Sequence, residues 1–452
     1  MAPGISASVH AVATGTTFGI AQSWIIVGAV FVCAVLLYSG ALFIRFQTSK
    51  PGLVIAYTDL SNRDLRIDLL RGVALTFVLV DHLGWSSIFQ GVTQEAIGPV
   101  SGAEFFVLFS GIVLAVAYRP KLDNGLIGEV TLRLITRAKK LYFIALIVVV
   151  AVYLLSLLPF VSATDLMTFT DEGTGSAGSG AVGTVRNLYP NINLLLEYPI
   201  VAWIIPQILL LELGPWQFNV IGLYVVLTLA APLVLWALAR KLWLAVIASS
   251  ALVYFIQAMA PQRILPSQFE DSFPLLTWQV LFVVGLVLGY HRRAVITWFG
   301  SRAGLVTLGM IVLLAISFML FSWTSPEFKS PADFRLSFLS ANTFHMIYAK
   351  FFYRTTLGLG RLVDVFFVAI AVYSLTSVYW KPIARAVGWY FVPLGQSSLS
   401  VFVIHVLLAL LAPNIPGLIT ENIWANSALY LVVLGLVWFV VKKRSAIPLI
   451  LR

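Results

Sequence analysis

Apolar runs of about 20 residues recur along the whole chain, and this feature constrains the fold more than any other. A helix of that length is what the hydrocarbon core of a bilayer requires. Of the 452 residues, 60% are hydrophobic and 11% are charged, whereas an ordinary soluble domain carries about 25% charged residues. A water-soluble fold cannot bury so much apolar surface, so the sequence predicts an all-α protein that crosses a membrane many times.

About eleven of these runs are expected to span the membrane. The first 44 residues contain no Lys or Arg, so the positive leader of a secretory signal is missing and the first run is expected to be a retained helix. The predicted spans are 22–45, 67–89, 102–118, 141–161, 217–239, 242–260, 273–290, 303–322, 362–380, 387–411 and 426–441.

The distribution of Lys and Arg predicts the orientation. With the N-terminus outside, 22 of the 29 basic residues fall on the cytoplasmic side and seven on the outer side. This bias predicts an N-out, C-in protein. The net charge of +10 comes from short clusters between apolar runs, so it indicates topology rather than nucleic-acid binding. The single cysteine, Cys33, excludes a disulfide within the chain.

Three parts follow from this reading. Residues 1–61 hold an outer segment, the first helix and a cytoplasmic linker, 62–443 form one multi-helix membrane domain, and 444–452 are a cytoplasmic tail. No internal repeat is visible.

Three segments do not fit a simple span. Residues 190–213 are apolar but interrupted by Glu197, Pro199 and Pro206, so a re-entrant or outer interfacial segment is expected. Residues 344–361 mix aromatic and basic residues, which is typical of an interfacial helix on the outer face. The loop 162–189 contains GTGSAGSGAVG and is expected to be a flexible connector, with a lid as the alternative.

Ionisable residues inside apolar spans are costly, so each is a functional candidate. Arg71 and His82 are eleven residues apart, which places them on one face of the second predicted helix and about 16 Å apart along its axis. Asp68, three residues before Arg71, is close enough to form an ion pair with it, and the alternative to a functional role is that both residues only lock the cytoplasmic end of the helix. His82 lies in the outer half of the span and is a candidate general base, with a packing histidine as the alternative.

Three further residues could lie near His82. Asp81 is its neighbour in sequence but points about 100° away around the helix, Glu104 is expected at a similar depth, and His405 should reach the outer half on a later span. A pair of histidines could suggest a metal, but no HExxH or close carboxylate spacing supports one, so no metal site is predicted.

Five stretches, in chain order, resemble the OpgC-type membrane acyltransferases, which belong with the broader acyltransferase family 3. The spacing of Arg71, ten residues and His82 also resembles that of the broader group. The stretches cover the chain from about Asn62 to Leu410 and read NRDLRIDLLRGVALTFVLVDHL, GAEFFVLFSG, FNVIGLYVVLTLAAPLVLW, TWQVLFVVGLVLG and LGQSSLSVFVIH.

The resemblance implies a core of about ten helices in a bacterial inner membrane. This core would transfer an acyl group from cytoplasmic acyl-CoA, with succinyl-CoA favoured, to a hydroxyl of a periplasmic or cell-envelope glycan. His82 would be the general base, with Asp81, Glu104 or His405 orienting it, and Arg71 would support the donor. The first helix, 22–45, would be an addition to that core.

Coenzyme A carries phosphates that need cationic partners at the inner face. The candidate donor-binding residues are Arg66, Asp68, Arg71, Arg133, Arg137 and Lys140, and plain topology-setting is the alternative for the cluster between Arg133 and Lys140. A transporter or flippase that exports a glycan or an acylated compound is the rival function, and a non-enzymatic assembly partner is a third.

Overall fold

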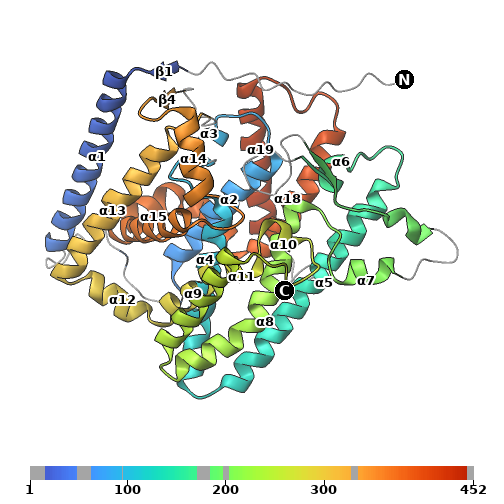
Figure 1. Ribbon diagram of the computed structural model, residues 1–452, viewed down its shortest axis with the longest axis horizontal. Coiled ribbons are helices and arrows are strands. Elements are labelled where there is room, and N and C mark those ends of the chain that lie inside the picture. The colour runs from blue at the N-terminus through green and yellow to red at the C-terminus, as the bar shows by residue number, and fades with distance from the viewer. Residues whose placement is uncertain are drawn as a thin grey trace.

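The computed structural model describes residues 16–47, 57, 63–93, 95–170, 184–196, 203–326 and 334–444. Helices dominate these residues, as the sequence predicts (Figure 1). The strands are short: β1 (Thr16–Phe18) pairs in parallel with β4 (Phe334–Leu336), and β2 (Thr168–Thr170) pairs with antiparallel β3 (Val185–Asn187). The protein is an all-α, polytopic membrane protein.

Seven helices of the described part are long and apolar enough to cross a bilayer, and two bent pairs raise the number to nine. Two other helices fall outside these criteria. The charged α2 (Leu65–Leu83) carries four ionisable groups besides His82, and α9 (Trp243–Met259) has 17 residues. Eleven spans and their orientation therefore stay predictions. The seven are α1 (Ile20–Gln47), α4 (Gly102–Asp123), α5 (Ile127–Ser156), η2 with α8 (Trp216–Phe218, Val220–Ala239), α13 (Arg302–Ser322), α15 (Leu359–Val378) and α19 (Ile423–Arg444).

Helix α2 lies inside the bundle, where other helices approach it at glycines. A Cβ on Gly102 of α4 would lie 2.5 Å from the carbonyl oxygen of Ala74. A Cβ on Gly72 would lie 2.0 Å from the carbonyl oxygen of Phe391 in α17 (Trp389–Gln396). Such close backbone contact is typical of membrane helices that pack through small residues. It holds the charged face of α2 away from lipid.

The predicted span 387–411 is wrong as one continuous helix. It is divided between α17 and α18 (Ser398–Leu411), and the pair that contains them bends by 90°. Pro393 has no N–H to bond the carbonyl of Trp389, which instead accepts from Nε1 of Trp438 at 3.0 Å. The break at Ser397 places polar groups inside the bundle, beside α2.

Two predicted boundaries also differ. The second span was expected to run to residue 89, but α2 ends at Leu83 because Gly84 takes a left-handed conformation with φ of 66° and caps the helix through its N–H. The fourth was expected to begin at residue 141, but α5 begins at Ile127. The cluster from Arg133 to Lys140 is therefore helical rather than part of a loop.

The described part of 190–213 forms two short helices, η1 (Ile192–Leu196) and α7 (Ile204–Leu209), which are too short to span a bilayer. Glu197, Pro199 and the Gly- and Ser-rich stretch of the 162–189 loop lie outside the described residues. The predicted interfacial helix 344–361 is shorter than expected: α14 (Ala341–Phe351) ends before a turn, and α15 begins at Leu359.

Helix α1 lies at the edge of the molecule, beside α13 and α15 (Figure 1). Its main polar contacts are the hydroxyl of Tyr38, which donates to the carbonyl of Leu305, and the hydroxyl of Tyr379, which donates to the carbonyl of Leu37. The remaining elements are α3 (Gln90–Thr93), α6 (Thr164–Met167), α10 (Phe269–Ser272), α11 (Leu275–Tyr290), α12 (Arg292–Phe299), α16 (Trp380–Ile383), η3 (Ala384–Gly388) and η4 (Ala412–Asn414).

Candidate functional site

Two histidines from distant parts of the chain meet at the end of α2. Nδ1 of His82 lies 3.1 Å from Nε2 of His405, and the two rings have centroids 5.1 Å apart. His405 is fully buried in α18, whereas His82 is half-buried. Because α2 ends one residue after His82, this ring sits in the last helical turn. Its Nε2 makes no hydrogen bond within the described residues and is the nitrogen left for a ligand.

Aromatic rings surround this pair. Trp216 of η2 lies edge-on to His82 with centroids 4.9 Å apart, and Phe402 lies 5.5 Å from His405. The indole Nε1 of Trp216 donates to the carbonyl of Asp165 in α6, which fixes the ring. Asp165 itself lies outside the spans, and burial raises the pKa of its carboxyl. The histidine pair therefore packs against aromatic rings from η2 and α18.

Of the three residues that the sequence placed near His82, only His405 contacts it. Oδ1 of Asp81 accepts a hydrogen bond of 2.7 Å from the hydroxyl of Thr93. Oε1 of Glu104 accepts one of 2.6 Å from Nε of Arg361, and Oε2 accepts from the backbone N–H of Ser101 at 2.8 Å. Asp81 and Glu104 therefore form hydrogen bonds with residues other than His82.

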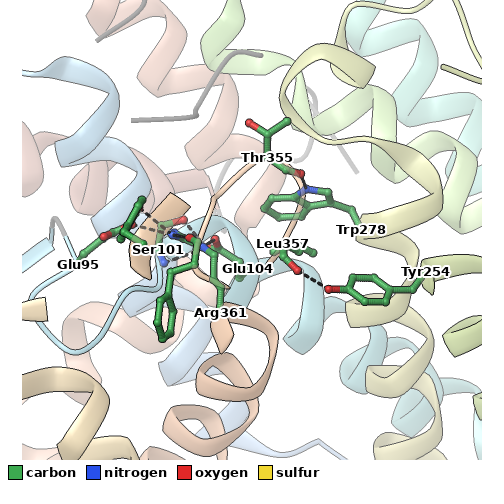
Figure 2. Close-up of polar contacts among 10 residues, drawn as sticks. Glu95, Ser101, Glu104, Tyr254, Trp278, Thr355, Leu357 and Arg361 are labelled. Atoms are coloured by element: carbon green, nitrogen blue, oxygen red, sulfur yellow. Dashed lines mark hydrogen bonds and ion pairs between the residues drawn. The ribbon is translucent and has the colours of Figure 1, made fainter. Parts of the chain in front are cut away.

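Arg361 forms a buried ionic centre with Glu104 (Figure 2). Its side chain is fully buried, and Nη1 donates to Oε1 of Glu95 at 2.8 Å, to the carbonyl of Phe352 at 3.1 Å and to the hydroxyl of Tyr348 at 3.2 Å. From the sequence, Arg361 is only one of the seven basic residues of the predicted outer side. Its two acidic partners are more than 250 positions away, so spacing could not reveal them.

Arg71 is buried and forms no ion pair within the described residues. Its Nη2 donates to the hydroxyl of Ser398, 2.6 Å away at the start of α18, and its Nε has no hydrogen-bond partner. Its guanidinium lies 5.5 Å from the ring of Phe106. The expected ion pair with Asp68 is wrong, because Asp68 binds Nε of Arg63 at 2.6 Å.

This arrangement leaves a buried cation without an acidic partner. Removing a charge from water is costly unless an opposite charge or good hydrogen bonds compensate it. Arg71 has one hydrogen bond, beside the break between α17 and α18 that the sequence did not predict. An anionic ligand would supply the missing compensation.

Arg66 makes a dense set of contacts at the N-terminal end of α2. Its guanidinium binds both oxygens of Asp64 at 2.9 and 2.8 Å, donates to Ser377 and lies 4.1 Å and 4.5 Å from the rings of Tyr57 and Tyr373. Burial would raise the pKa of the Asp64 carboxyl, but the hydrogen bonds and charge of Arg66, together with other groups there, hold it below its usual value. These contacts indicate that Arg66 stabilises the fold at this end of α2. Its role in donor binding stays a prediction.

The other candidate donor-binding residues lie along α5. Arg133 pairs with Glu129 at 2.7 Å, and Glu129 also binds Lys121. Arg137 is exposed, and its charge acts on that of Arg71. Lys140 is half-buried on the same helix. The structure therefore brings Arg137 within electrostatic reach of Arg71, whereas Arg133 already has an acidic partner.

The comparison with known proteins gives one match. The family profile described as OpgC protein matches residues 63–447, which is most of the chain. Neither the curated proteins nor the solved structures contain a match. The matched range includes α2 with Arg71 and His82, the ionic centre of Arg361 and the helix that carries His405. The chain belongs to the OpgC family.

Proposed function

We propose that the protein is a multi-pass O-acyltransferase of a bacterial inner membrane, which transfers an acyl group from cytoplasmic acyl-CoA to a hydroxyl of a periplasmic or cell-envelope glucan. Membership in the OpgC family suggests a membrane glucan-modifying acyltransferase. The observation that carries the proposal is the contact between Nδ1 of His82 and Nε2 of His405, which leaves Nε2 of His82 to act as a base.

A sugar hydroxyl is a weak nucleophile, and a nearby imidazole increases its reactivity by taking its proton. In the proposed reaction, Nε2 of His82 accepts the hydroxyl proton while the hydroxyl oxygen attacks the thioester carbonyl carbon. The C–S bond then breaks, and His82 passes the proton to the departing thiolate. The products are the glucan ester and free coenzyme A, so no proton is gained or lost.

Arg71 fits a role in donor binding. It is a buried cation without an acidic partner among the described residues, and it lies on α2 about 16 Å from His82 along the helix axis. The phosphates of coenzyme A would supply the missing negative charge, and the extended arm of the cofactor would then carry the thioester toward His82. Arg137 would add a second cation at the same end.

A transporter is the second candidate, because transporters use broken helices to form sites inside the membrane. The break between α17 and α18, with Arg71 beside it, resembles such a site. The two functions differ in their need for His82: acyl transfer requires a base, whereas export of a finished compound does not.

The test uses the purified full-length protein with acyl-CoA and a glucan acceptor. We expect His82→Ala to lower kcat by about 100-fold or more, since general base catalysis contributes 10²- to 10⁴-fold, while the protein still binds the donor. His345→Ala, which removes an exposed histidine on α14, is the matched control and should transfer normally. Normal transfer by His82→Ala would exclude His82 as the base.

A further inference from the structure

The segment that carries α6 is fastened beside the histidine pair. The backbone carbonyl of Asp165 accepts hydrogen bonds from Nε1 of Trp216 at 3.2 Å and from Nε2 of Gln217 at 3.0 Å. Just before α6, the backbone N–H of Ser162 donates to Oδ1 of Asn414 at 2.6 Å, and Nδ2 of Asn414 donates to the carbonyl of Ser162 at 2.8 Å. Helix α6 is therefore held against η2 and against the end of α18 (Figure 1).

Three half-buried rings contact one another next to this segment. The ring centroids of Phe169, in β2, and Trp216 are 5.5 Å apart, and those of Trp216 and His82 are 4.9 Å apart. Each of the three side chains keeps part of its surface accessible. A substrate that reaches the free Nε2 of His82 would therefore meet the indole of Trp216 beside it.

The carboxyl of Asp165 adds a polar group to this aromatic surface. Its side chain is open to solvent, and within the described residues the carboxyl forms no hydrogen bond or ion pair. Surrounding atoms still displace enough water to raise the pKa of this carboxyl. The backbone carbonyl of the same residue holds the indole of Trp216, so the carboxyl also lies near that ring. Its oxygens are available to accept hydrogen bonds from a ligand.

This combination of an aromatic ring and a carboxyl fits a sugar. A pyranose ring has an apolar face of C–H groups and a rim of hydroxyls. The face of an aromatic ring is electronegative and attracts the weakly positive C–H groups, while carboxyl oxygens accept hydrogen bonds from hydroxyls. A sugar against Trp216 would have rim hydroxyls close to His82, because the two side chains are in contact. A linear polyol has similar hydroxyls but lacks the rigid apolar face.

We propose that Trp216 and Asp165 form the acceptor subsite, in which a pyranose ring of the glucan packs on the indole and its hydroxyls bond the carboxyl. One further hydroxyl of that ring then lies at Nε2 of His82. This inference rests on the proposed acyltransferase function and adds to it the residues that bind the acceptor. Trp216 and Asp165 bind the sugar in this scheme, whereas His82 moves the proton.

The test measures transfer by the purified full-length protein from succinyl-CoA or acetyl-CoA to oligosaccharides prepared from neutral cell-envelope glucan. Trp216→Leu keeps an apolar side chain but removes the ring. We expect it to raise the KM for the glucan by about 3- to 10-fold, which is the contribution of one aromatic contact. The KM for acyl-CoA should stay constant. Trp216→Phe keeps a ring and should retain most of the affinity for the glucan.

Asp165→Asn tests the polar half of the subsite. The substitution keeps the backbone carbonyl that holds Trp216 and an amide oxygen that can accept a hydrogen bond. We expect it to raise the KM for the glucan by about 2- to 10-fold, because a charge-assisted hydrogen bond becomes a neutral one. Trp424→Leu is the matched control for the ring, since Trp424 is an exposed tryptophan at the start of α19, and it should leave this KM unchanged.

Small competitors test whether the ring of the sugar is recognised. Methyl glucoside, a single pyranose, should inhibit transfer to the glucan competitively, and it should inhibit Trp216→Leu less than the wild type. Sorbitol, which has hydroxyls but no ring, should not inhibit either protein. Equal inhibition by the two compounds would overturn the proposal. A fall in kcat at constant glucan KM in Trp216→Leu would also overturn it, because Trp216 would then act on His82 and not on the sugar.

The proposed function can fail separately. Titration calorimetry with the same oligosaccharides and no donor measures binding alone. If the wild type transfers no acyl group but binds the glucan more tightly than Trp216→Leu does, the acyltransferase assignment is wrong and the subsite stands. If the wild type transfers acyl groups and both substituted proteins keep its glucan affinity, only the subsite is wrong. Size-exclusion elution and the thermal midpoint identify a folding defect in Trp216→Leu, and the exposed change Asp165→Asn decides in that case.

Discussion

At the residue scale, His405 decides which nitrogen of His82 can act. When Nδ1 of His82 carries the hydrogen, it donates to Nε2 of His405 and leaves Nε2 of His82 as an acceptor for a proton. No carboxylate contacts His82 within the described residues, so the orienting group of the proposed base is a second, buried histidine.

We expect His405→Ala to lower kcat by about 10- to 100-fold, because it removes the acceptor that fixes the His82 tautomer. This loss is smaller than the 10²- to 10⁴-fold that general base catalysis itself contributes, because His82 is still present. The KM for acyl-CoA should stay nearly constant. His405→Gln provides an amide oxygen that can accept from Nδ1 and should recover part of the rate. Steady-state kinetics with both variants check this, and full activity of His405→Ala would rule out the orienting role.

The candidate site residues could be identified from the sequence, but most of the residues that contact them could not. His82, Arg71, Glu104 and His405 stand out because ionisable groups are rare in apolar spans. The contacts of His82 with His405 and of Arg71 with Ser398 join positions more than 300 residues apart, and a single sequence contains no signal for such pairs. The local pair Asp68–Arg71 was predicted from spacing, but Arg63 offered Asp68 a closer partner.

At the element scale, the crossing of α2 and α17 supports the site. A Cβ on Gly395 would lie 1.8 Å from the carbonyl oxygen of Asp68, so the two backbones touch there. The same crossing sets the position of the break that follows α17, and Gln396 at its end donates to Asp68 at 3.2 Å. Ser398 beyond the break then binds Arg71.

Gly395→Ala should therefore destabilise the protein by about 1–3 kcal/mol or more, because overpacking forces the two helices apart. Gly435→Ala is the control: Gly435 lies in α19, its Cβ would meet nothing within 4 Å, and alanine favours a helix. Thermal unfolding in detergent measures both. An unchanged midpoint for Gly395→Ala would mean that the crossing is looser than the structure describes.

Most of the helices could be predicted from the sequence. The bilayer core holds no water to bond backbone N–H and C=O groups, so an apolar run that crosses it forms a hydrogen-bonded helix. Helices form at most of the predicted spans. The break at Ser397 was not predicted, because proline and glycine also occur within unbroken membrane helices. Pro393 leaves the carbonyl of Trp389 without its helical donor, and this carbonyl accepts a hydrogen bond from Nε1 of Trp438 instead. That contact depends on tertiary packing.

At the scale of the whole molecule, the charged centre and the apolar rim are separated. Arg361, Glu104 and His405 are fully buried, whereas α1 exposes Trp24, Ile25 and Leu36 at the edge of the bundle (Figure 1). Lipid would cover that edge in a membrane. The family profile begins at residue 63, after α1, so the matched range contains the histidine pair and Arg71 without it.

The mass spectrum of cell-envelope glucans tests the central claim most directly. Cells that produce the wild-type protein should yield glucans with a mass gain that matches an acyl ester, and cells that produce His82→Ala at equal abundance should yield unmodified glucans. The size of the gain identifies the acyl group. Identical glucan masses with wild-type protein, His82→Ala and no protein would contradict acyl transfer by this chain.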